Sequence, residues 1–377
     1  MTTTEIKKID FIDLKAQQRR IRASLEQRIK NVMDHGAYIM GPEIAELEGK
    51  LANYVGVKHC VTCASGTDAL LLPLMAYDIK PGDVIFTPPF TFIATAEVVA
   101  LLGASVVFVD IDPRTYNIDP AKLEEEIQKF LKNSSGKKAR GIIPVDLFGL
   151  TADYDPIEVV AKKYNLFVLQ DAAQSFGATY KGRKAGSMGN IGATSFFPAK
   201  PLGCYGDGGA IFCNDDAMLQ KLRSIRVHGQ GSDKYNNIRI GINGRMDTMQ
   251  AAVLLAKMEI FDEEIHLRNT VAARYTEKLK NAATPPFVPK ECVSVWAQYS
   301  LLVQHRDEML AKLKSRGVPT AVYYPKPLHL QEAFRNLGYK RGDFPVSERI
   351  AESIFSVPMH PYLSEDVQDY IVKAITE

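Results

Sequence analysis

Short apolar runs alternate with longer stretches of helical periodicity from about residue 58 onward. Strands that alternate with helices usually form a mostly parallel sheet with helices on both faces, so this pattern predicts an α/β domain. The predicted strands are 59–63, 84–87, 106–109, 141–145, 167–170 and 211–213. The predicted helices between them are 68–76, 95–102, 120–131 and 156–164.

The pattern changes near residue 246, where one long helical stretch continues to about residue 279. Beyond it, a strand-like run at 299–303, a helix at 308–316 and a proline-rich stretch at 319–327 indicate a smaller α/β unit. A chain of 377 residues also exceeds the size at which one core keeps growing. We therefore expect a large domain over residues 1–250 and a small domain over residues 251–377, connected by the long helix. The polar segment 132–138 is expected to be an exposed loop within the large domain.

Composition and charge exclude several partner classes. The 46 basic and 44 acidic residues are interspersed and give a net charge of +2, so there is no broad electrostatic basis for binding nucleic acid or an anionic membrane. The longest apolar run, 98–109, is too short to span a bilayer, and residues 1–8 do not resemble a signal peptide. Five cysteines suggest reduced, buried thiols in a cytoplasmic protein. Seven scattered histidines without metal-ligand spacing give no support for a metal site.

The strongest chemical signal is Lys200, which Pro198 and Pro201 bracket in a stiff turn. A lysine that bonds covalently to pyridoxal phosphate (PLP) needs such a fixed position. Asp171 follows the apolar run 166–169, so it lies where a buried strand ends, and it can face the ring nitrogen of the cofactor. Taken alone, Lys200 could be a solvated loop lysine and Asp171 a helix N-cap.

Other elements of such a site follow in order. Residues 64–68 join a strand to a helix, whose free amides could bind a phosphate, although an ordinary capped turn has the same sequence. Ser195 offers a second phosphate hydroxyl. Phe90 and Phe92 follow the second strand; one could stack on a pyridine ring, or both could be core residues. Gln174 could reach the phenolic oxygen of the cofactor.

Six ordered motifs resemble those of the DegT/StrS family of nucleotide-sugar aminotransferases. They are Ser65-Gly66-Thr67, Phe90-Thr91-Phe92, Asp171-Ala172-Ala173-Gln174, the segment 195–200, the segment 206–210 and Gly241-Ile242-Asn243-Gly244-Arg245. The resemblance runs from Ile12 to Pro361 and so covers essentially the whole chain. It implies the fold of fold-type I PLP-dependent transferases, with a mostly parallel seven-stranded sheet in the large domain and a smaller C-terminal α/β domain. It also implies a homodimer whose active sites are shared between subunits.

The resemblance implies a role for each motif residue. Lys200 would bond covalently to PLP, Asp171 would pair with the pyridine nitrogen, Gln174 would contact the phenolic oxygen and Phe92 would stack on the ring. The residues implied for the phosphate are Gly66, Thr67, Ser195 and Asn243 of the partner subunit. The candidate substrate-binding residues are Arg245, Tyr38, Tyr324 and His360.

The implied reaction moves an amino group from L-glutamate to a nucleotide-linked keto sugar. Residues 201–206 are most similar to enzymes that aminate C3 of a UDP-linked 2-acetamido-3-keto uronic acid for O-antigen and related surface polysaccharides. Ala199 and Pro201 stand where serine and asparagine are frequent in the family, and the second departure favours the uronate subgroup. Amination of a 4-keto or 3-keto deoxy sugar on UDP or dTDP is the alternative within the enzyme class. A regulator or binding module without turnover is the alternative outside it, and the complete set of motifs argues against it.

Overall fold

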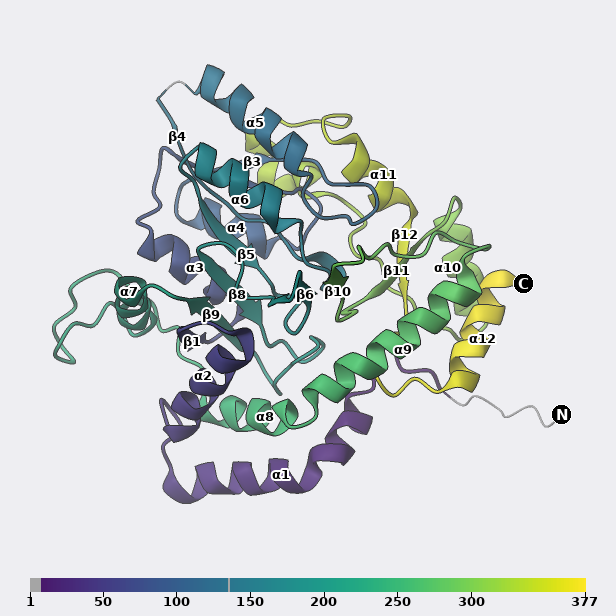
Figure 1. The fold of residues 1–377 in the computed structure, drawn as a ribbon, viewed down its shortest axis with the longest axis horizontal. Helices are drawn as coiled ribbons and strands as arrows, with labels where there is room; N and C mark the ends of the chain where they lie inside the picture. Colours follow the sequence, from purple (N-terminus) through teal and green to yellow (C-terminus); the bar gives the residue numbers. More distant parts are fainter. Residues whose placement is uncertain (1–7, 135) are drawn as a thin grey trace.

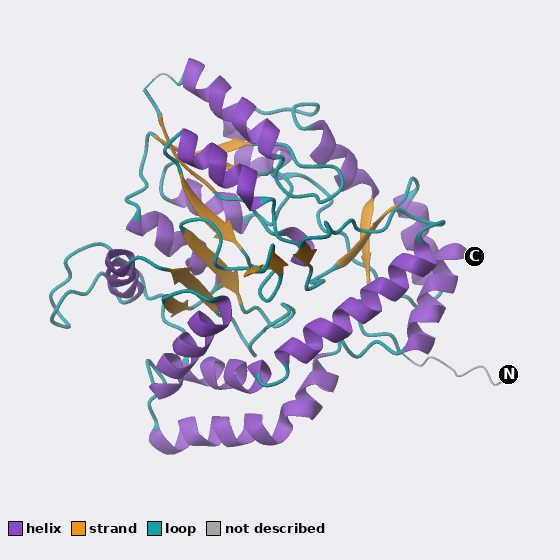
Figure 2. Cartoon of the chain, viewed as in Figure 1, coloured by secondary structure: helices purple, strands orange, loops and turns teal. Residues whose placement is uncertain are grey.

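The centre of the protein is a sheet of seven strands (Figures 1 and 2), in a computed structural model that describes residues 8–134 and 136–377. In spatial order the strands are β1 (His59–Cys63), β9 (Gly209–Cys213), β8 (Ile191–Ser195), β5 (Phe167–Asp171), β4 (Lys138–Ile142), β2 (Asp83–Thr87) and β3 (Ser105–Phe108). The strand β9 pairs antiparallel with both of its neighbours, and the remaining pairings are parallel. The predicted mostly parallel seven-stranded sheet is confirmed.

Helices cover both faces of the sheet (Figure 1). They include α1 (Leu14–His35), α2 (Pro42–Val55), α3 (Gly66–Ala76), α4 (Ala94–Leu101), α5 (Pro120–Asn133), α6 (Tyr154–Lys163) and α7 (Asp216–Arg226). Alternate side chains of one strand therefore enter different cores: Val84 and Phe86 of β2 belong to one hydrophobic cluster, and Ile85 belongs to the other. Burial on both faces explains why these strands are continuous apolar runs that the sequence reveals.

The strand β8 is the one member of the sheet that the apolar pattern did not predict. Its sequence, Ile-Gly-Ala-Thr-Ser, consists mainly of small residues. A Cβ atom at Gly192 would lie 2.3 Å from the carbonyl oxygen of Gly186, so the strand packs through close backbone approach. Hydrophobic periodicity cannot detect packing of this kind.

The prediction of one long connecting helix over 246–279 is wrong, because the chain forms two helices there. The first is α8 (Thr248–Met258) and the second is α9 (Phe261–Leu279), with a non-helical ψ of 3° at Ile260 between them. Residues of α8 lie in the same core as α1 and α2, whereas Val271, Tyr275 and Leu279 of α9 lie in the C-terminal core. The bend lets one continuous apolar pattern serve two cores, which is why the break is not visible in the sequence.

The C-terminal part contains a two-stranded antiparallel sheet of β11 (Tyr299–Leu302) and β12 (Ile354–Val357). The helices around it are α10 (Arg306–Ser315), α11 (Pro345–Ser353) and α12 (Glu365–Thr376). Short 3₁₀ turns are η1 (Leu147–Gly149), η2 (Leu328–Leu330) and η3 (Glu332–Leu337), and a small sheet joins β10 (Cys292–Val293), β6 (Thr179–Tyr180) and β7 (Arg183–Lys184). Three residues of this part pack against the large sheet: Leu328, Phe334 and Phe344. The domain boundary at residue 250 stays a prediction.

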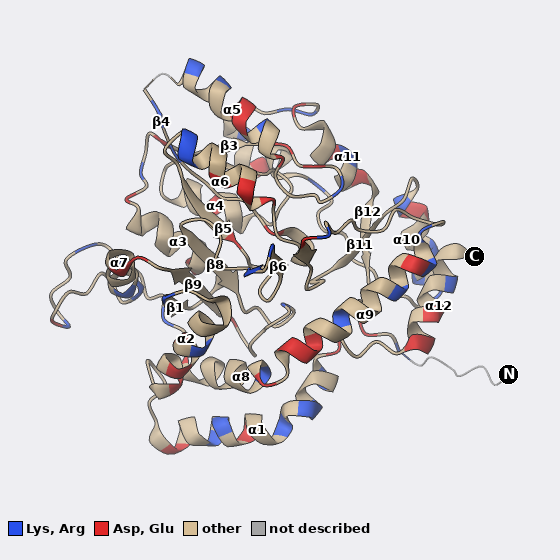
Figure 3. Cartoon of the chain, in the orientation of Figure 1, with Lys and Arg blue, Asp and Glu red and all other residues tan. Residues whose placement is uncertain are grey.

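The remaining expectations from composition concern cysteines, metals and charge. All five cysteines are free and buried, with Cys60 and Cys63 of β1 in the two opposite cores. Basic and acidic residues are interspersed over the helices (Figure 3). Within residues 8–134 and 136–377, no three metal-ligating side chains form a cluster, and no helix is long and apolar enough to cross a membrane.

A buried ion pair joins α2, β1 and the end of α7. The Nη1 atom of Arg226 lies 2.6 Å from Oε1 of Glu48, and it also donates to the carbonyl of Thr62 at 2.9 Å. The Arg226 side chain is only 4% exposed and that of Glu48 is 12% exposed. Removing one partner would leave the other charge buried and uncompensated.

We therefore expect Glu48→Ala to lower the free energy of unfolding by about 3–5 kcal/mol. The matched control is Glu46→Ala on the same helix, whose exposed carboxylate pairs with Lys50. This control should cost less than about 1 kcal/mol. Urea unfolding followed by circular dichroism measures both values, and similar losses in the two variants would contradict the assignment.

Candidate active site

A cavity of about 450 Å³ opens at the carboxyl ends of the parallel strands. The segments that follow β1, β2, β4, β5 and β8 all reach it, as is usual for ligand sites in open α/β sheets. Of the predicted site residues, those that line it are Gly66, Thr67, Phe92, Asp171, Gln174, Ser195, Lys200 and Tyr324. Residues far apart in the sequence thus meet because their strands end at one edge.

Asp171 is the last residue of β5 and is only 4% exposed. Its carboxylate accepts hydrogen bonds from Oγ1 of Thr95 at 2.8 Å and from the amide of Ala173 at 3.1 Å. Burial raises the pKa of Asp171 above its ordinary value, and these two donors and the charge of Lys200 offset only part of that shift. The donors stabilise the ionised form, which can accept a further N–H from a protonated pyridine ring.

Lys200 lies in the turn after β8, where its amide donates to the carbonyl of Phe197 at 2.9 Å. Its side chain is half-buried and borders the cavity, so the solvated loop lysine is excluded. Burial lowers the pKa of Lys200 to about 8, although the charge of Asp171 opposes the shift. An amine that loses its proton near this pH is a competent nucleophile and proton carrier.

The N-terminus of α3 forms one end of the cavity. Ser65 caps the helix by accepting from the amide of Asp68 at 3.0 Å, and the amides of Gly66 and Thr67 occupy the first turn, where no helical carbonyl can accept from them. A Cβ atom at Gly66 would lie 2.6 Å from Cβ of Ser195. Glycine therefore lets the helix end approach the Ser195 hydroxyl, and together they fit a phosphate.

Two aromatic residues from the segment after β2 have different environments. Phe90 is buried in a core. For this residue, the alternative of a core role is therefore the correct one. Phe92 is 54% exposed, and it borders the cavity with its ring 6.5 Å from the ring of Tyr324. An exposed aromatic face in a cavity is suited to stacking on a planar ring.

Gln174 is held by two hydrogen bonds. Its Oε1 atom accepts from the amide of Phe148 at 2.8 Å, and its Nε2 atom donates to the hydroxyl of Tyr324 at 3.2 Å. The amide group is thus oriented at the wall of the cavity, where it can donate a second hydrogen bond to a phenolic oxygen.

Four predicted residues do not line this cavity within one chain. Asn243 and Tyr38 are exposed, and Arg245 is half-buried with no hydrogen-bond partner for its Nε atom in the described part of the protein. His360 is buried elsewhere, where burial and the charge of Arg268 lower its pKa to about 4. Their roles toward cofactor or substrate stay predictions.

The sequence reasoning missed several residues of the site. Thr95 orients Asp171, and Tyr323 and Gln298 line the cavity. Asp146 is fully buried and accepts from Nε2 of Gln170 and Oγ of Ser175, each at 2.7 Å. Asp146 could have been found in the sequence, because it is a polar residue directly after the predicted strand 141–145. Gln298 could not, because no motif precedes it.

A family model that describes the DegT/DnrJ/EryC1/StrS aminotransferase family matches residues 19–376. The chain belongs to this family. It is 50% identical to a UDP-2-acetamido-2-deoxy-3-oxo-D-glucuronate aminotransferase of Pseudomonas aeruginosa, with 98% of this chain and 99% of the relative covered.

Two solved structures share the fold of this chain. One is a family member from Brucella abortus, with a TM-score of 0.95, 50% identity and coverage of 97% of this chain and 98% of the other. The second is NtdA of Bacillus subtilis with its bound cofactor PMP, with a TM-score of 0.90, 28% identity and coverage of 100% and 86%.

This aminotransferase uses PLP, the cofactor of its family, and the cavity fits that group. A buried acid, a lysine of lowered pKa, an exposed aromatic ring and a helix N-terminus lie around one space of sufficient size. Each of these matches one chemical feature of PLP: the ring nitrogen, the aldehyde carbon, the ring face and the phosphate.

Replacing Lys200 should stabilise the apoprotein in a pH-dependent way. The pKa of Lys200 falls from its ordinary 10.5 to about 8 on folding, so below pH 8 the folded state carries a costly buried charge. This cost declines as the pH rises from about 8 to 10.5. Apo Lys200→Met should therefore be more stable than the wild type by about 1–3 kcal/mol at pH 7, with a diminishing difference at higher pH.

Urea unfolding of both apoproteins between pH 7 and pH 10 measures the difference. The control is Lys80→Met, which removes an exposed lysine from a turn and should show no such trend. A stability difference for Lys200→Met that does not depend on pH would contradict the assigned shift.

Proposed function

We propose that this aminotransferase moves the amino group of L-glutamate to C3 of UDP-2-acetamido-2-deoxy-3-oxo-glucuronic acid, for the synthesis of O-antigen or related surface polysaccharides in the cytoplasm. The observation that carries the proposal is the 50% identity over nearly the full length of both chains to an enzyme named for that substrate. The cavity supports it, because every predicted cofactor residue except Asn243 lines it.

The residues of the cavity have distinct tasks in this reaction. When bound, PLP supplies an electron sink for the charge that develops on the substrate carbon. The carboxyl group of Asp171, oriented by Thr95, would pair with the pyridine nitrogen and favour its protonated form. The amine of Lys200, with a pKa of about 8, accepts a proton from the substrate carbon and returns it, which a lysine at its ordinary pKa would do less readily near neutral pH.

Phosphate and ring contacts hold the cofactor while the lysine moves protons. Ser65 orders the helix end that presents the amides of Gly66 and Thr67, and Ser195 lies directly beside them. Phe92 covers one face of the ring space. Because these residues do not include Lys200, they would hold the cofactor independently of the lysine.

The proposal includes a homodimer with shared sites. Large apolar side chains are exposed at 38–40 in the loop after α1, at Ile238 and Ile240 in the loop after α7, and at Phe197 beside the cavity. Exposed large apolar side chains are often covered at a protein interface. A partner subunit would cover them and could bring Asn243 to the phosphate and Arg245 to the carboxylate of the uronate, since these two residues do not reach the cavity of their own chain.

The first half of the reaction is tested by the visible absorbance of the PLP-loaded protein. Adding L-glutamate should remove the absorption band of the lysine-bound cofactor in the wild type, because the amino group passes to the cofactor. Lys200→Ala should show no such change. A wild-type band that glutamate leaves unaltered would contradict glutamate as the donor.

The second half is tested by adding keto sugars to the glutamate-treated enzyme. The 3-oxo uronate on UDP should restore the original band at lower concentrations than 4-keto or 3-keto deoxy sugars on UDP or dTDP. Faster restoration by a deoxy sugar would replace the proposed substrate with the alternative. Failure of every sugar, with the glutamate step intact, would overturn the nucleotide-sugar assignment.

A subunit-mixing experiment tests the shared site. If Arg245 acts across the dimer, Lys200→Ala and Arg245→Ala subunits, each defective alone on the uronate, should form mixed dimers with one intact site. At random pairing about a quarter of all sites would then be intact. Co-expressed subunits with different affinity tags allow the mixed dimer to be isolated. Mixed dimers without uronate activity would place Arg245 and Lys200 in the same site of one chain, or Arg245 outside the site.

A further inference from the structure

Two threonine hydroxyl groups form a chain that ends on the carboxyl group of Asp171. Oγ1 of Thr95 donates to Oδ2 of Asp171 at 2.8 Å, and the hydroxyl oxygens of Thr91 and Thr95 lie 3.0 Å apart. Thr91 is 3% exposed and Thr95 is 1% exposed, and both residues border the catalytic cavity. The chain is thus shielded from bulk water, and hydrogen bonds in such surroundings are electrostatically stronger than in water.

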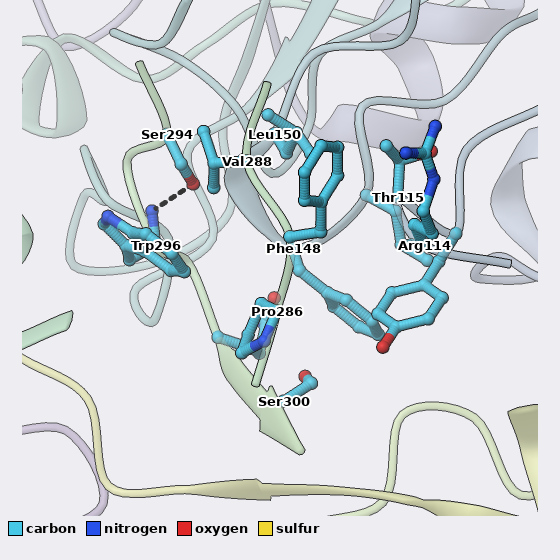
Figure 4. Close-up of a pocket in the computed structure, with 13 residues that line it drawn as sticks. Arg114, Thr115, Phe148, Leu150, Pro286, Val288, Ser294, Trp296 and Ser300 are labelled. Atoms are coloured by element: carbon cyan, nitrogen blue, oxygen red, sulfur yellow. Dashed lines mark hydrogen bonds between the residues drawn. The ribbon is translucent and has the colours of Figure 1, made fainter. Parts of the chain in front are cut away.

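Packing holds the segment that carries the two threonines. The ring centre of Phe90 lies 6.1 Å from that of Tyr324 and 6.5 Å from that of Phe148, and both pairs meet edge to face. Figure 4 shows Phe148 beside a second, mainly apolar pocket of about 20 Å³, which is too small for a substrate. Thr95 lies in the first turn of α4, four residues after Thr91. The fold therefore fixes the distance between the two hydroxyl groups.

The direction of the chain is fixed because each hydroxyl group has only one hydrogen. When Thr95 donates to Asp171, Thr91 must be the donor to Thr95. The other oxygen of Asp171 accepts from the amide of Ala173, so this arrangement suits a carboxylate. The opposite direction begins at a protonated Asp171 and needs an additional acceptor for the hydrogen of Thr91. The paired hydroxyls therefore favour the ionised carboxyl group and oppose the effect of burial.

The titratable groups around Asp171 do not replace this chain. The charge of Asp171 acts on the phenols of Tyr154 and Tyr324, but burial raises the pKa of both, so they stay neutral at neutral pH. Lys200 is the nearby cation, and burial lowers its pKa to about 8. Once Lys200 loses its proton, the groups among the described residues that still favour the carboxylate are Thr95 and the amide of Ala173.

We propose that Thr91 and Thr95 are positioning residues that act through Asp171 to keep the ring nitrogen of the cofactor protonated. Neither hydroxyl group needs to contact the ring. An ionised carboxylate pairs with a protonated nitrogen, which is the form in which the cofactor best accepts electrons. The inference goes beyond the proposed sugar reaction, and it rests on the predicted pairing of Asp171 with the ring nitrogen.

The test measures the affinity of the full-length apoprotein for PLP and for its 1-deaza analogue, in which a C–H group replaces the ring nitrogen. Thr95→Val replaces the hydroxyl with a methyl group. We expect its dissociation constant for PLP to rise about 10-fold, because a hydrogen bond to a charged group is lost. The analogue has no nitrogen to pair with Asp171, so its affinity should not fall. Thr95→Ser keeps the hydroxyl and should bind PLP nearly as well as the wild type, and Thr91→Val should show a smaller loss than Thr95→Val.

The matched control is Thr87→Val on β2. Thr87 is fully buried, its hydroxyl donates to the carbonyl of Ile143 at 2.8 Å, and it does not border the cavity. This control should not distinguish PLP from the analogue.

A loss of affinity for PLP that exceeds the loss for the analogue in Thr95→Val, and not in Thr87→Val, supports the inference. Equal losses for the two ligands, no loss for either, or a Thr95→Ser variant as weak as Thr95→Val overturn it. A wild type that binds PLP no more tightly than the analogue would reject the pairing of Asp171 with the ring nitrogen, and the inference with it. None of these measurements involves the sugar, so the proposed substrate is judged separately.

Discussion

The rest of the site depends on the hydrogen bonds that hold the carboxyl group of Asp171, buried at the end of a central strand. Burial alone would favour its neutral form, so the protein supplies donors and a nearby cation to hold the charge. Thr95 is one of these donors, and its hydroxyl lies 3.0 Å from that of Thr91. The nearby cation is Lys200, and burial lowers its pKa. One buried space thus raises the pKa of an acid and lowers the pKa of a base.

A second buried carboxylate, that of Asp146, supports the segment that carries Asp171. The Asp146 carboxylate accepts hydrogen bonds from the side chains of Gln170 and Ser175, which lie on either side of Asp171 in the sequence. The backbone amide of Asp146 donates to the carbonyl of Asp171 at 3.0 Å. Burial raises the pKa of Asp146 to about 6 in spite of its donors. This network fixes the backbone at the end of β5, which determines where the Asp171 carboxylate lies.

Small residues determine how closely the elements of the site approach one another. Gly66 places the start of α3 against Ser195, and Gly192 lets β8 pass beside Gly186. A side chain at either position would separate a helix or a strand from its neighbour by more than the packing allows. This end of the cavity therefore depends on the absence of a side chain at Gly66, which lets the start of α3 lie directly against the Ser195 side chain.

The sequence by itself determined six of the seven strands, the family and eight of the residues that line the cavity. Strands buried on both faces are apolar along their whole length, and motif residues such as Lys200 and Asp171 occur at characteristic positions next to them. Tertiary structure decided what periodicity cannot express. The strand β8 is held by backbone contact, and the bend between α8 and α9 leaves the apolar pattern unbroken. The hydrogen bond from Thr95 to Asp171 is visible only when distant segments meet around one cavity, because hydrogen bonding depends on neighbours in space.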